Sequence, residues 1–211
     1  MYALTASRNE NDMTWLNAVT LKGATVSLEP LSLERHDELA AAVSDGELWK
    51  LWYTFIPAPE ALGADIEQRL ALQRQGSMLP FAVIDRASKL AVGITAFMHA
   101  DSANRRIEIG STWYRRSVQR TALNTECKLL LLRHAFEALD CIAVEFRTHF
   151  FNQASRRAIE RLGARLDGVL RNHRLSSNGT LRDTCVYSII DSEWPTVRTH
   201  LEFQLSGREN R

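Results

Sequence analysis

The sequence predicts a single α/β domain in which helices pack against one mixed sheet. Strand-like and helix-like segments alternate along its 211 residues, and strand–helix–strand crossovers imply some parallel pairing. Two hairpins, one around 87–89 and one around the Asn-Gly pair at 178–179, imply antiparallel pairing. No repeat, low-complexity tract or linker divides the chain, so we expect one domain over 15–211 behind a flexible tail at 1–14.

Alternation and helical spacing of apolar residues predict the elements of the first half. Ser32 is the expected N-cap of the first helix, whose inner face carries Leu39, Ala40 and Val43 and which ends at Gly46. In order, we expect a strand at 24–29, helices at 32–46 and 64–75, and strands at 81–85, 90–98 and 106–113.

Residues 47–63 lie between the first two helices and combine large aromatic side chains with two prolines, which favours a loop or a broken helix. Tyrosine and tryptophan have an apolar body and a polar tip, so they suit both a pocket wall and a core. Two interpretations stay open. Trp52 and Tyr53 line a substrate pocket, or together with Trp49 they cover the core.

The second half begins at the strand 106–113, whose side chains are expected to alternate between two faces. One face would carry Arg106, Glu108, Gly110 and Thr112, and the other Ile107, Ile109, Ser111 and Trp113. After it we expect a helix at 124–139, a strand at 142–151, a helix from Asn152 to Gly163, strands at 166–175 and 180–190, and a helix from Ser192.

Residues 105–139 form the most informative junction, because a strand leads there through a basic, polar loop into a long amphipathic helix. The backbone N–H groups of such a loop and the first free N–H groups of the helix point the same way. A phosphate at this place would meet several donors and the positive end of the helix dipole. The junction therefore predicts an anion site, and the competing interpretation is a solvated basic surface.

Composition limits the classes of function. The net charge is +1, with 26 basic and 25 acidic residues, so bulk electrostatics favours neither nucleic acid nor an anionic membrane as a partner. No apolar run approaches the roughly 20 residues of a membrane span, and the N-terminus lacks a secretory signal pattern, so we expect a cytoplasmic protein. The three cysteines and six histidines lack metal-ligand spacing, so we expect buried thiols and no metal.

Three motifs carry a family resemblance. They are the strand RIEIGSTW with the following RRSVQRTALNTE, the segment FFNQASRRAIERLGA, and LRDTCVYSI with the later SEW. Together they resemble the GNAT acyl-CoA N-acyltransferase superfamily, and within it the RimJ/RimL-like branch that acetylates protein N-termini and small amines. The resemblance covers about residues 20–191. It implies a mostly antiparallel twisted sheet with a splayed central strand pair and helices on both faces, and acetyl-CoA as cosubstrate.

The basic loop departs from the family pattern Arg/Gln-x-x-Gly-x-Gly/Ala. Arg120 occupies the first glycine position and Ala122 the second. Backbone N–H groups donate whatever the side chain, but arginine adopts left-handed conformations less readily than glycine. Arg115, Arg116 and Arg120 are expected to compensate in part by pairing with the phosphates of CoA.

The resemblance also implies a cofactor site on two strand–helix units. Backbone groups near Trp113 would hold the pantetheine arm and polarise the acyl carbonyl. Asn152 would cap its helix and reach the pantetheine. The expected cofactor-binding residues are Trp113, Tyr114, Val118, Gln119, Arg120, Thr121, Ala122, Leu123, Asn124, Thr125, Asn152 and Ser155.

Two residues are candidates for catalysis by the same resemblance. Glu108 matches a strand position where many family members carry the carboxylate that accepts the amine proton. Its alternative is an ion pair with Arg106 or with a neighbouring strand. Ser155 matches a serine near the CoA sulfur and can donate one hydrogen bond to a leaving thiolate, but it can also simply support the helix N-terminus. The family's usual tyrosine acid falls at Ile159, so that role is vacant or filled elsewhere.

The leading hypothesis is an N-acetyltransferase that moves an acetyl group from acetyl-CoA to a primary amine, on a protein N-terminus or a small molecule, by direct attack in a ternary complex. The alternative is a non-catalytic CoA-binding or partner-binding module. A covalent relay through Cys185 and His149 is a minor route. Acceptor specificity would come from the loop 47–63 and the hairpin 171–183, and a homodimer is compatible with the exposed edges of the sheet.

Overall fold

The computed structural model describes residues 15–176 and 178–209, so the expected tail at 1–14 lies outside the described residues. One eight-stranded sheet has the order β1-β2-β3-β4-β5-β6-β8-β7, and every neighbouring pair is antiparallel except β5 with β6. The strands are β1 Leu21–Lys22, β2 Val26–Pro30, β3 Met78–Asp85, β4 Ala91–Asp101, β5 Arg106–Tyr114, β6 Ala143–His149, β7 Arg165–Leu175 and β8 Leu181–Ile190.

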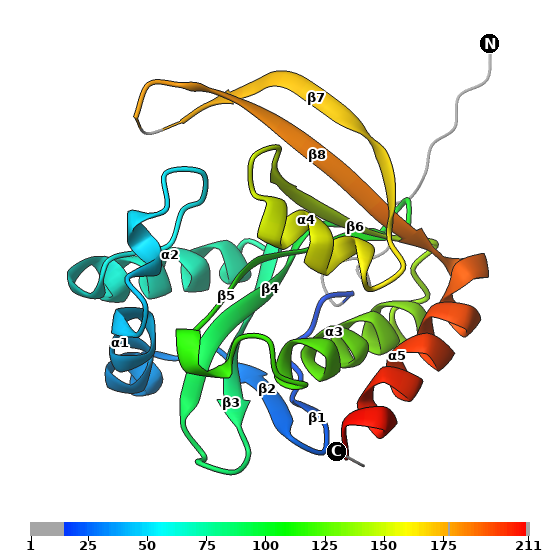
Figure 1. The fold of residues 1–211 in the computed structure, drawn as a ribbon, viewed down its shortest axis with the longest axis horizontal. Coiled ribbons are helices and arrows are strands. Elements are labelled where there is room, and N and C mark those ends of the chain that lie inside the picture. The colour runs from blue at the N-terminus through cyan, green and yellow to red at the C-terminus, as the bar shows by residue number, and fades with distance from the viewer. Residues whose placement is uncertain (1–14, 177, 210–211) are drawn as a thin grey trace.

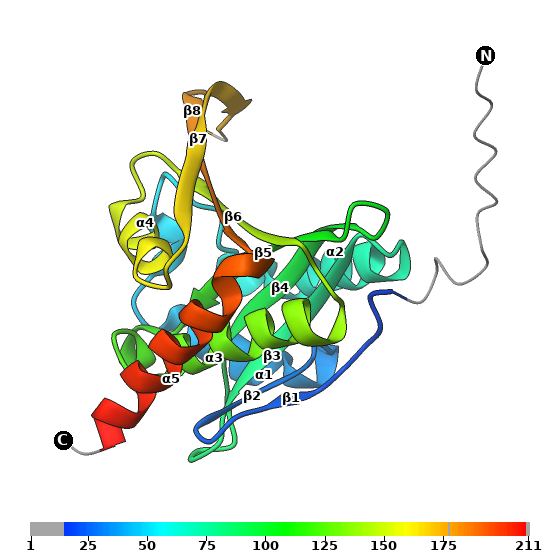
Figure 2. The same cartoon turned by 90° about the vertical axis from the view of Figure 1, so that its right-hand side faces the viewer.

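Helices cover both faces of this sheet (Figures 1 and 2). They are α1 His36–Ser44, α2 Leu62–Arg74, α3 Leu123–Arg133 with a π-helical continuation His134–Ala138, α4 Gln153–Glu160 and α5 Trp194–Glu209. A buried cluster around Phe97 and Leu131 lies between the sheet and α3 and α5. A second cluster around Leu39, Ile66 and Trp113 lies between the sheet and α1 and α2. The predicted mixed, mostly antiparallel fold with helices on both faces is confirmed.

The parallel pair at the centre of the sheet is short. Only residues from Arg106 to Glu108 of β5 pair with Ala143 to Glu145 of β6. Beyond this point β6 continues to pair with β8 as far as His149, while β5 continues to pair with β4 as far as Tyr114. The two strands therefore separate toward their C-terminal ends, which is the splayed central pair expected from the resemblance.

A bulge in β5 overturns the expected alternation of its side chains. Ser111 has a φ of +50°. Gly110 pairs with Ala96 and Trp113 pairs with Ile94, so two residues of β5 lie opposite one residue of β4. An extra residue exchanges the two faces of the strand beyond it. Ile107 and Ile109 lie in the cluster against α3 and α5, whereas Trp113 lies in the cluster against α1 and α2.

Glu126 fastens the start of α3 to the N-terminal edge of the sheet. Its buried carboxylate accepts hydrogen bonds from the backbone N–H groups of Ala24, Thr25 and Val26 at 2.5, 2.8 and 3.0 Å, and from the hydroxyl of Thr25. A Cβ on Gly23 would lie 2.5 Å from Glu126 Oε1, so only glycine permits this close approach.

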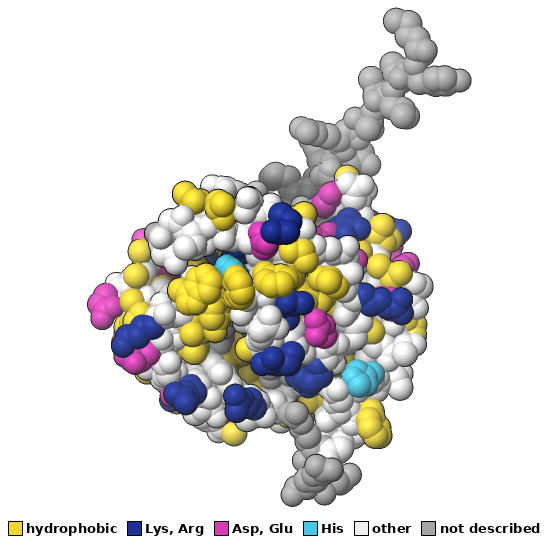
Figure 3. Space-filling view, turned by 45° about the horizontal axis from the view of Figure 1, so that its top comes forward, with side chains coloured by type: hydrophobic (Ala, Val, Ile, Leu, Met, Phe, Trp, Pro, Cys, Tyr) yellow, Lys and Arg dark blue, Asp and Glu magenta, His cyan; other side chains and the backbone are white. Residues whose placement is uncertain are grey.

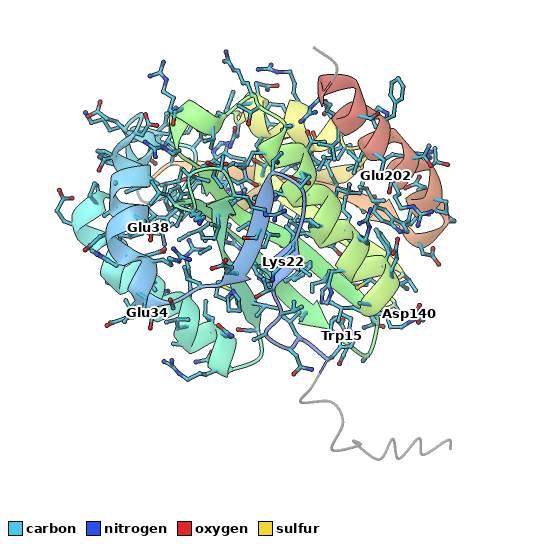
Figure 4. The ribbon with its side chains drawn as sticks, turned by 90° about the horizontal axis from the view of Figure 1, so that it is seen from below. Trp15, Lys22, Glu34, Glu38, Asp140 and Glu202 are labelled. Atoms are coloured by element: carbon cyan, nitrogen blue, oxygen red, sulfur yellow. The ribbon has the colours of Figure 1, made fainter. Side chains whose placement is uncertain are left out.

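Two details of the predicted helices are wrong. The Ser32 side chain caps nothing, because a 3₁₀ turn over Leu33–Arg35 precedes α1. The helix expected at 124–139 is not α-helical throughout, because a π-helical turn follows α3, with Phe136 buried and Ala138 exposed. At the same end of the molecule Trp15 Nε1 donates to the Leu139 carbonyl at 3.2 Å, near Asp140 (Figure 4).

Candidate active site

The separated ends of β5 and β6 open onto a cavity of about 490 Å³. The loop 47–63, the start of α3, α4 and the β7–β8 hairpin complete its walls. Among the residues expected from the sequence, the cavity is lined by Tyr53, Glu108, Trp113, Tyr114, Gln119, Asn124, Asn152 and Ser155. The structure thus brings both catalytic candidates and five of the other cofactor candidates to one cavity.

The other candidates do not line this cavity. They are Trp52, Val118, Arg120, Thr121, Ala122, Leu123 and Thr125. Leu123 and Thr125 are buried, because the first turn of α3 packs into the protein, and Thr125 Oγ1 accepts a hydrogen bond from Arg161 at 3.2 Å. Trp52 is half exposed and packs on Tyr53 and His149.

The loop before α3 places its backbone in the conformation that glycine favours. Arg120 has a φ of +63°, a left-handed conformation, at the position where the family pattern has its first glycine. Thr121 Oγ1 accepts the N–H of Leu123 at 3.3 Å, and Glu126 N donates to Ala122 O. This leaves the N–H groups of Asn124 and Thr125 with no acceptor among the described residues, as helix geometry dictates for a first turn.

Glu108 lies at the closed end of the cavity, on the last residue pair before β5 and β6 separate. Only 7% of Glu108 is exposed, and its Oε2 lies 2.9 Å from His99 Nδ1 and 3.5 Å from Arg147 Nε. A Cβ on Gly110 would lie 2.8 Å from Glu108 Oε1, so the glycine leaves room for the carboxylate. Of the two alternatives for Glu108, the ion pair with Arg106 is not formed, because Arg106 pairs with Glu145, whereas the ion pair with a neighbouring strand is present as Arg147 on β6.

Asn152 and Ser155 come from the junction between β6 and α4. Asn152 Oδ1 accepts the backbone N–H of Ser155 at 3.0 Å, so the predicted N-cap is confirmed. The Ser155 hydroxyl is half-buried in the cavity wall and has no hydrogen-bond partner within 15–176 and 178–209. Ile159 is buried in the core, and no tyrosine takes its place on α4.

Lys128 on α3 is a site residue that sequence reasoning missed. It is 7% exposed, and its Nζ donates to Thr112 Oγ1 at 2.9 Å and to Thr95 Oγ1 at 3.3 Å, beside the bulge in β5. Burial lowers the pKa of Lys128, and it has no carboxylate partner in the described part of the chain. Its signal was the unbroken apolar run from Leu129 to Leu132, since a helix that is apolar all round is buried all round.

The opposite face of the bulge is held by a buried ion pair on α2. Arg69 Nε lies 2.6 Å from Asp65 Oδ2, and Arg69 Nη1 donates to Ser111 Oγ at 2.6 Å. Both side chains of the pair are less than 10% exposed. The left-handed residue Ser111 is therefore fixed from α2, while Thr112 is fixed from α3, so the strained strand has support on both sides.

Aromatic residues form the wall next to the end of β6. His149 is 3% exposed and packs against Trp52, Tyr53 and Phe151, with ring centroids 5.1, 6.4 and 5.8 Å away. Its Nδ1 accepts the backbone N–H of Phe151 at 3.1 Å, so the neutral ring carries its proton on Nε2. Nε2 is buried without a hydrogen-bond partner among the described residues.

Arginines occupy the cavity wall formed by β7 and β8. Arg174 and Arg182 lie directly opposite each other across this strand pair. Arg182 is half-buried, and its Nε donates to Thr184 Oγ1 at 3.1 Å. Burial and the charge of Arg174 lower the pKa of Arg182, and the same arginines add to burial in lowering the pKa of His173.

The three cysteines are free and buried, as expected. Burial raises the pKa of Cys185 and raises that of Cys141 to about 12, so both stay protonated thiols at neutral pH. Cys185 is fully buried in the core and His149 Nδ1 is engaged by Phe151, so the two do not form an activated nucleophile.

A search of the described residues finds no group of three or more side chains suited to hold a metal ion. None of the helices described here is long and apolar enough to cross a membrane.

The fold is that of an α/β protein with one mostly antiparallel sheet, whose parallel central strands separate beside the N-terminus of α3. Residues 25–165 match the family described as an acetyltransferase (GNAT) domain, which is more than half of the chain. The chain therefore belongs to the GNAT acetyltransferase family.

Individual relatives agree with this assignment. YdaF of Bacillus subtilis strain 168, named as a candidate ribosomal N-acetyltransferase, is 30% identical over 102 residues, which are 48% of this chain and 55% of that protein. The chain thus spans about half the length of this curated relative. A GCN5-related N-acetyltransferase from Brucella melitensis is 34% identical with a TM-score of 0.79, over 90% of this chain and 86% of that chain.

Mycobacterium smegmatis RimJ, solved in complex with CoA-disulfide, is 20% identical with a TM-score of 0.73, over 89% of this chain and 93% of that chain. At this identity the match shows a shared fold. The sequence match to YdaF agrees with the RimJ/RimL-like resemblance of the sequence motifs.

Proposed function

We propose that this protein transfers an acetyl group from acetyl-CoA to a primary amine, on a protein N-terminus or a small molecule, by direct attack in a ternary complex. The observation that carries the proposal is the buried Glu108 carboxylate at the closed end of a cavity whose wall also holds Ser155 and the start of α3. A carboxylate, a hydroxyl donor and a helix N-terminus are the groups that amine acylation by a thioester needs.

The cofactor would enter at the open end of the separated strands. The free N–H group of Asn124, which lines the cavity, would bind the pyrophosphate, aided by the dipole of α3. The backbone of β5 between its bulge and Trp113 has no strand partner on the β6 side, so it can hydrogen-bond the pantetheine arm. A donor from this stretch aimed at the acyl oxygen would stabilise the tetrahedral intermediate.

Four events complete the transfer. The neutral amine nitrogen attacks the thioester carbon, and the carbonyl oxygen becomes an oxyanion. The amine proton passes to Glu108, directly or through one water. The C–S bond then breaks as the carbonyl reforms, and the CoA thiolate leaves. Ser155 donates a hydrogen bond to this thiolate until solvent protonates it.

Titration calorimetry with acetyl-CoA and with CoA tests the cofactor step, and thiol release against a panel of peptides and small amines tests the transfer. We expect binding in the micromolar range or tighter and turnover with at least one acceptor. Absence of binding at high micromolar ligand would remove the CoA-dependent function altogether. Binding without any thiol release would favour a non-catalytic CoA-binding module, the reading that the lost loop glycine and Ile159 support.

We also propose that the protein works in the cytoplasm. The name of its relative YdaF refers to a ribosomal N-acetyltransferase, and acetyl-CoA is a cytoplasmic cosubstrate. Fractionation of cells that produce the full chain checks this location.

A further inference from the structure

We propose that the acceptor is a peptide N-terminus with an acidic side chain among its first residues, and that Arg174, Arg182 and His149 bind this carboxylate. This inference rests on the proposed acetyl transfer to an amine. It narrows the acceptor from any primary amine to one chemical class.

The first argument is the cross-strand arginine pair. Arg174 and Arg182 face each other across β7 and β8, and like charges in directly opposed positions destabilise a sheet. Neither has an ion pair with a carboxylate in residues 15–176 and 178–209. The carboxylates of this region are already engaged: Glu108 by His99 and Arg147, and Asp183 by Arg171 at 2.7 Å. Arg174 is exposed and Arg182 is half-buried, so both guanidinium groups are free to pair with an external anion.

The second argument is the local electrostatic field. Besides burial, arginine charges lower the pKa values of three groups on this wall, namely Arg182, His173 and His149. Only Glu108 opposes the effect on Arg182. The wall formed by β6, β8 and β7 is therefore positive although the whole chain carries a net charge of only +1.

The third argument is the unused donor of His149. His149 lines the same cavity, and its buried Nε2–H has no hydrogen-bond partner in the described part of the chain. A buried donor left unpaired destabilises the free protein, so a ligand that supplied the acceptor next to His149 would be favoured. The two guanidinium groups and this N–H are all hydrogen-bond donors, and an ionised carboxylate only accepts hydrogen bonds, so it matches them.

The rim of the cavity favours a peptide over a small amino acid. Phe55 lines the cavity and is 76% exposed, and Trp52 and Phe151, 50 and 60% exposed, pack on each other at 5.9 Å and against the cavity residue His149. Figure 3 shows hydrophobic side chains gathered beside Lys and Arg side chains on this face of the molecule. Exposed aromatics next to arginines are the composition of protein-binding surfaces, and a free amino acid would leave them uncovered.

Matched acceptors test the inference on the full chain. The probes are ten-residue peptides that begin Ser-Asp-Glu, Ser-Asn-Gln or Ser-Lys-Lys and are otherwise identical, with free aspartate and glutamate as small acceptors. With acetyl-CoA present, we expect kcat/KM for the acidic peptide to exceed that for the amide peptide by about tenfold, the effect of one charge-assisted contact. Equal rates for the acidic and amide peptides would overturn the inference.

Variants locate the effect. In Arg174→Gln/Arg182→Gln the preference for the acidic peptide should fall to about onefold, and Arg174→Glu should favour the Ser-Lys-Lys peptide. Arg171→Gln is the control, because Arg171 is exposed on the same strand and paired with Asp183. A preference that survives the double variant, or that Arg171→Gln removes, contradicts the assignment. Faster turnover of free glutamate than of the acidic peptide would overturn the choice of a peptide.

Binding separates this inference from the proposed function. Peptide affinity is measured by calorimetry with CoA-loaded protein, so it needs no turnover. If no acceptor reacts but the acidic peptide binds about tenfold more tightly than the amide peptide, the acceptor class stands and the transfer activity fails. If transfer occurs without any difference in binding or rate between these two peptides, the activity stands and the acceptor class fails.

Discussion

The two sides of the cavity differ in how their charged groups are paired. On the β5 side, which comprises β4, β5 and α3, each buried charged group has partners within the protein: Glu108 has His99 and Arg147, Glu126 has three backbone N–H groups, and Lys128 has two hydroxyls. On the β6 side, which comprises β6, β8 and β7, Arg174 is exposed, the half-buried Arg182 has only the Thr184 hydroxyl, and the buried Nε2–H of His149 has no hydrogen-bond partner among the described residues. The β5 side therefore uses its charges to hold the strands and α3 in place, and the β6 side has charged groups left to bind a ligand.

The largest expected effect is on the β5 side. Glu126→Ala should lower the free energy of unfolding by about 3–5 kcal/mol, because three backbone N–H groups, of which that of Val26 is buried, and one hydroxyl lose a charged acceptor. Urea denaturation measures it. The control is Glu202→Ala, an exposed partner of Arg133 (Figure 4), which should cost less than about 0.5 kcal/mol. Equal losses for the two variants would show that the carboxylate of Glu126 does not hold the edge of the sheet.

Glu108→Gln should lower kcat by about 100-fold, which corresponds to about 2.7 kcal/mol, because the amide cannot accept the amine proton. The dissociation constant for acetyl-CoA should change little. Glu145→Gln is the matched control, since Glu145 is the cross-strand neighbour of Glu108 and pairs with Arg106. A small loss for Glu108→Gln, or an equal loss for both variants, would remove Glu108 from the proton path.

Arg120→Gly should raise the free energy of unfolding by about 1 kcal/mol relative to Arg120→Ala, because glycine adopts the φ of +63° without the steric cost of a Cβ. Both variants lose the same guanidinium, so their difference isolates the backbone. Thermal unfolding of the two proteins side by side measures it. If alanine proves as stable as glycine, the loop changes its conformation when the side chain is shortened.

On the β6 side, removing a charge should increase stability. Arg174→Gln should raise the free energy of unfolding by roughly 0.2–1 kcal/mol, because it removes the repulsion from Arg182 directly opposite. Arg171→Gln removes an ion pair with Asp183 instead and should give no increase. A loss of stability in Arg174→Gln would mean that Arg174 has a stabilising role in the free protein.

The smallest effect concerns pH. Burial and the charge of Arg182 lower the pKa of His149 in the folded protein. Below about pH 6.5 the unfolded chain is therefore protonated at this residue, whereas the folded chain takes up the proton only at a lower pH. Stability should therefore fall as the pH drops from about 6.5 toward the lowered pKa. Phenylalanine at this position should flatten that part of the profile, whereas His200→Gln on exposed α5 should leave it intact. An unchanged slope in His149→Phe would assign the proton to another group.

Most elements were predictable because their signals are local. Apolar spacing marks the helices, alternation marks the outer strands, and Asn152 caps α4 as its position indicated. The bulge at Ser111 was not predictable, because alternation carries no sign of an extra residue. The apolar run from Leu129 to Leu132 signals that α3 is buried, but the partners of Glu126 and Lys128, the N-terminal edge of the sheet and two threonines, come from distant parts of the chain and could not be predicted.

The arginine pair shows how much one residue of register decides. A two-residue turn at Asn178 and Gly179 would place Arg174 opposite Asp183, an ion pair within the hairpin. In the structure Ser176 N donates to Thr180 O, and this register places Arg174 opposite Arg182. The hairpin was predictable from the sequence, but the positive wall required the register.

The contact between Glu126 and the turn at Ala24 to Val26 also has a consequence for the order of events during synthesis. The two partners are 100 to 102 residues apart in the chain. The backbone donors of Ala24 to Val26 therefore find their acceptor only after α3 has been synthesised. Contacts between residues so far apart in the sequence form late in folding. The N-terminal edge of the sheet is the first part of the domain to be made and among the last to be finished.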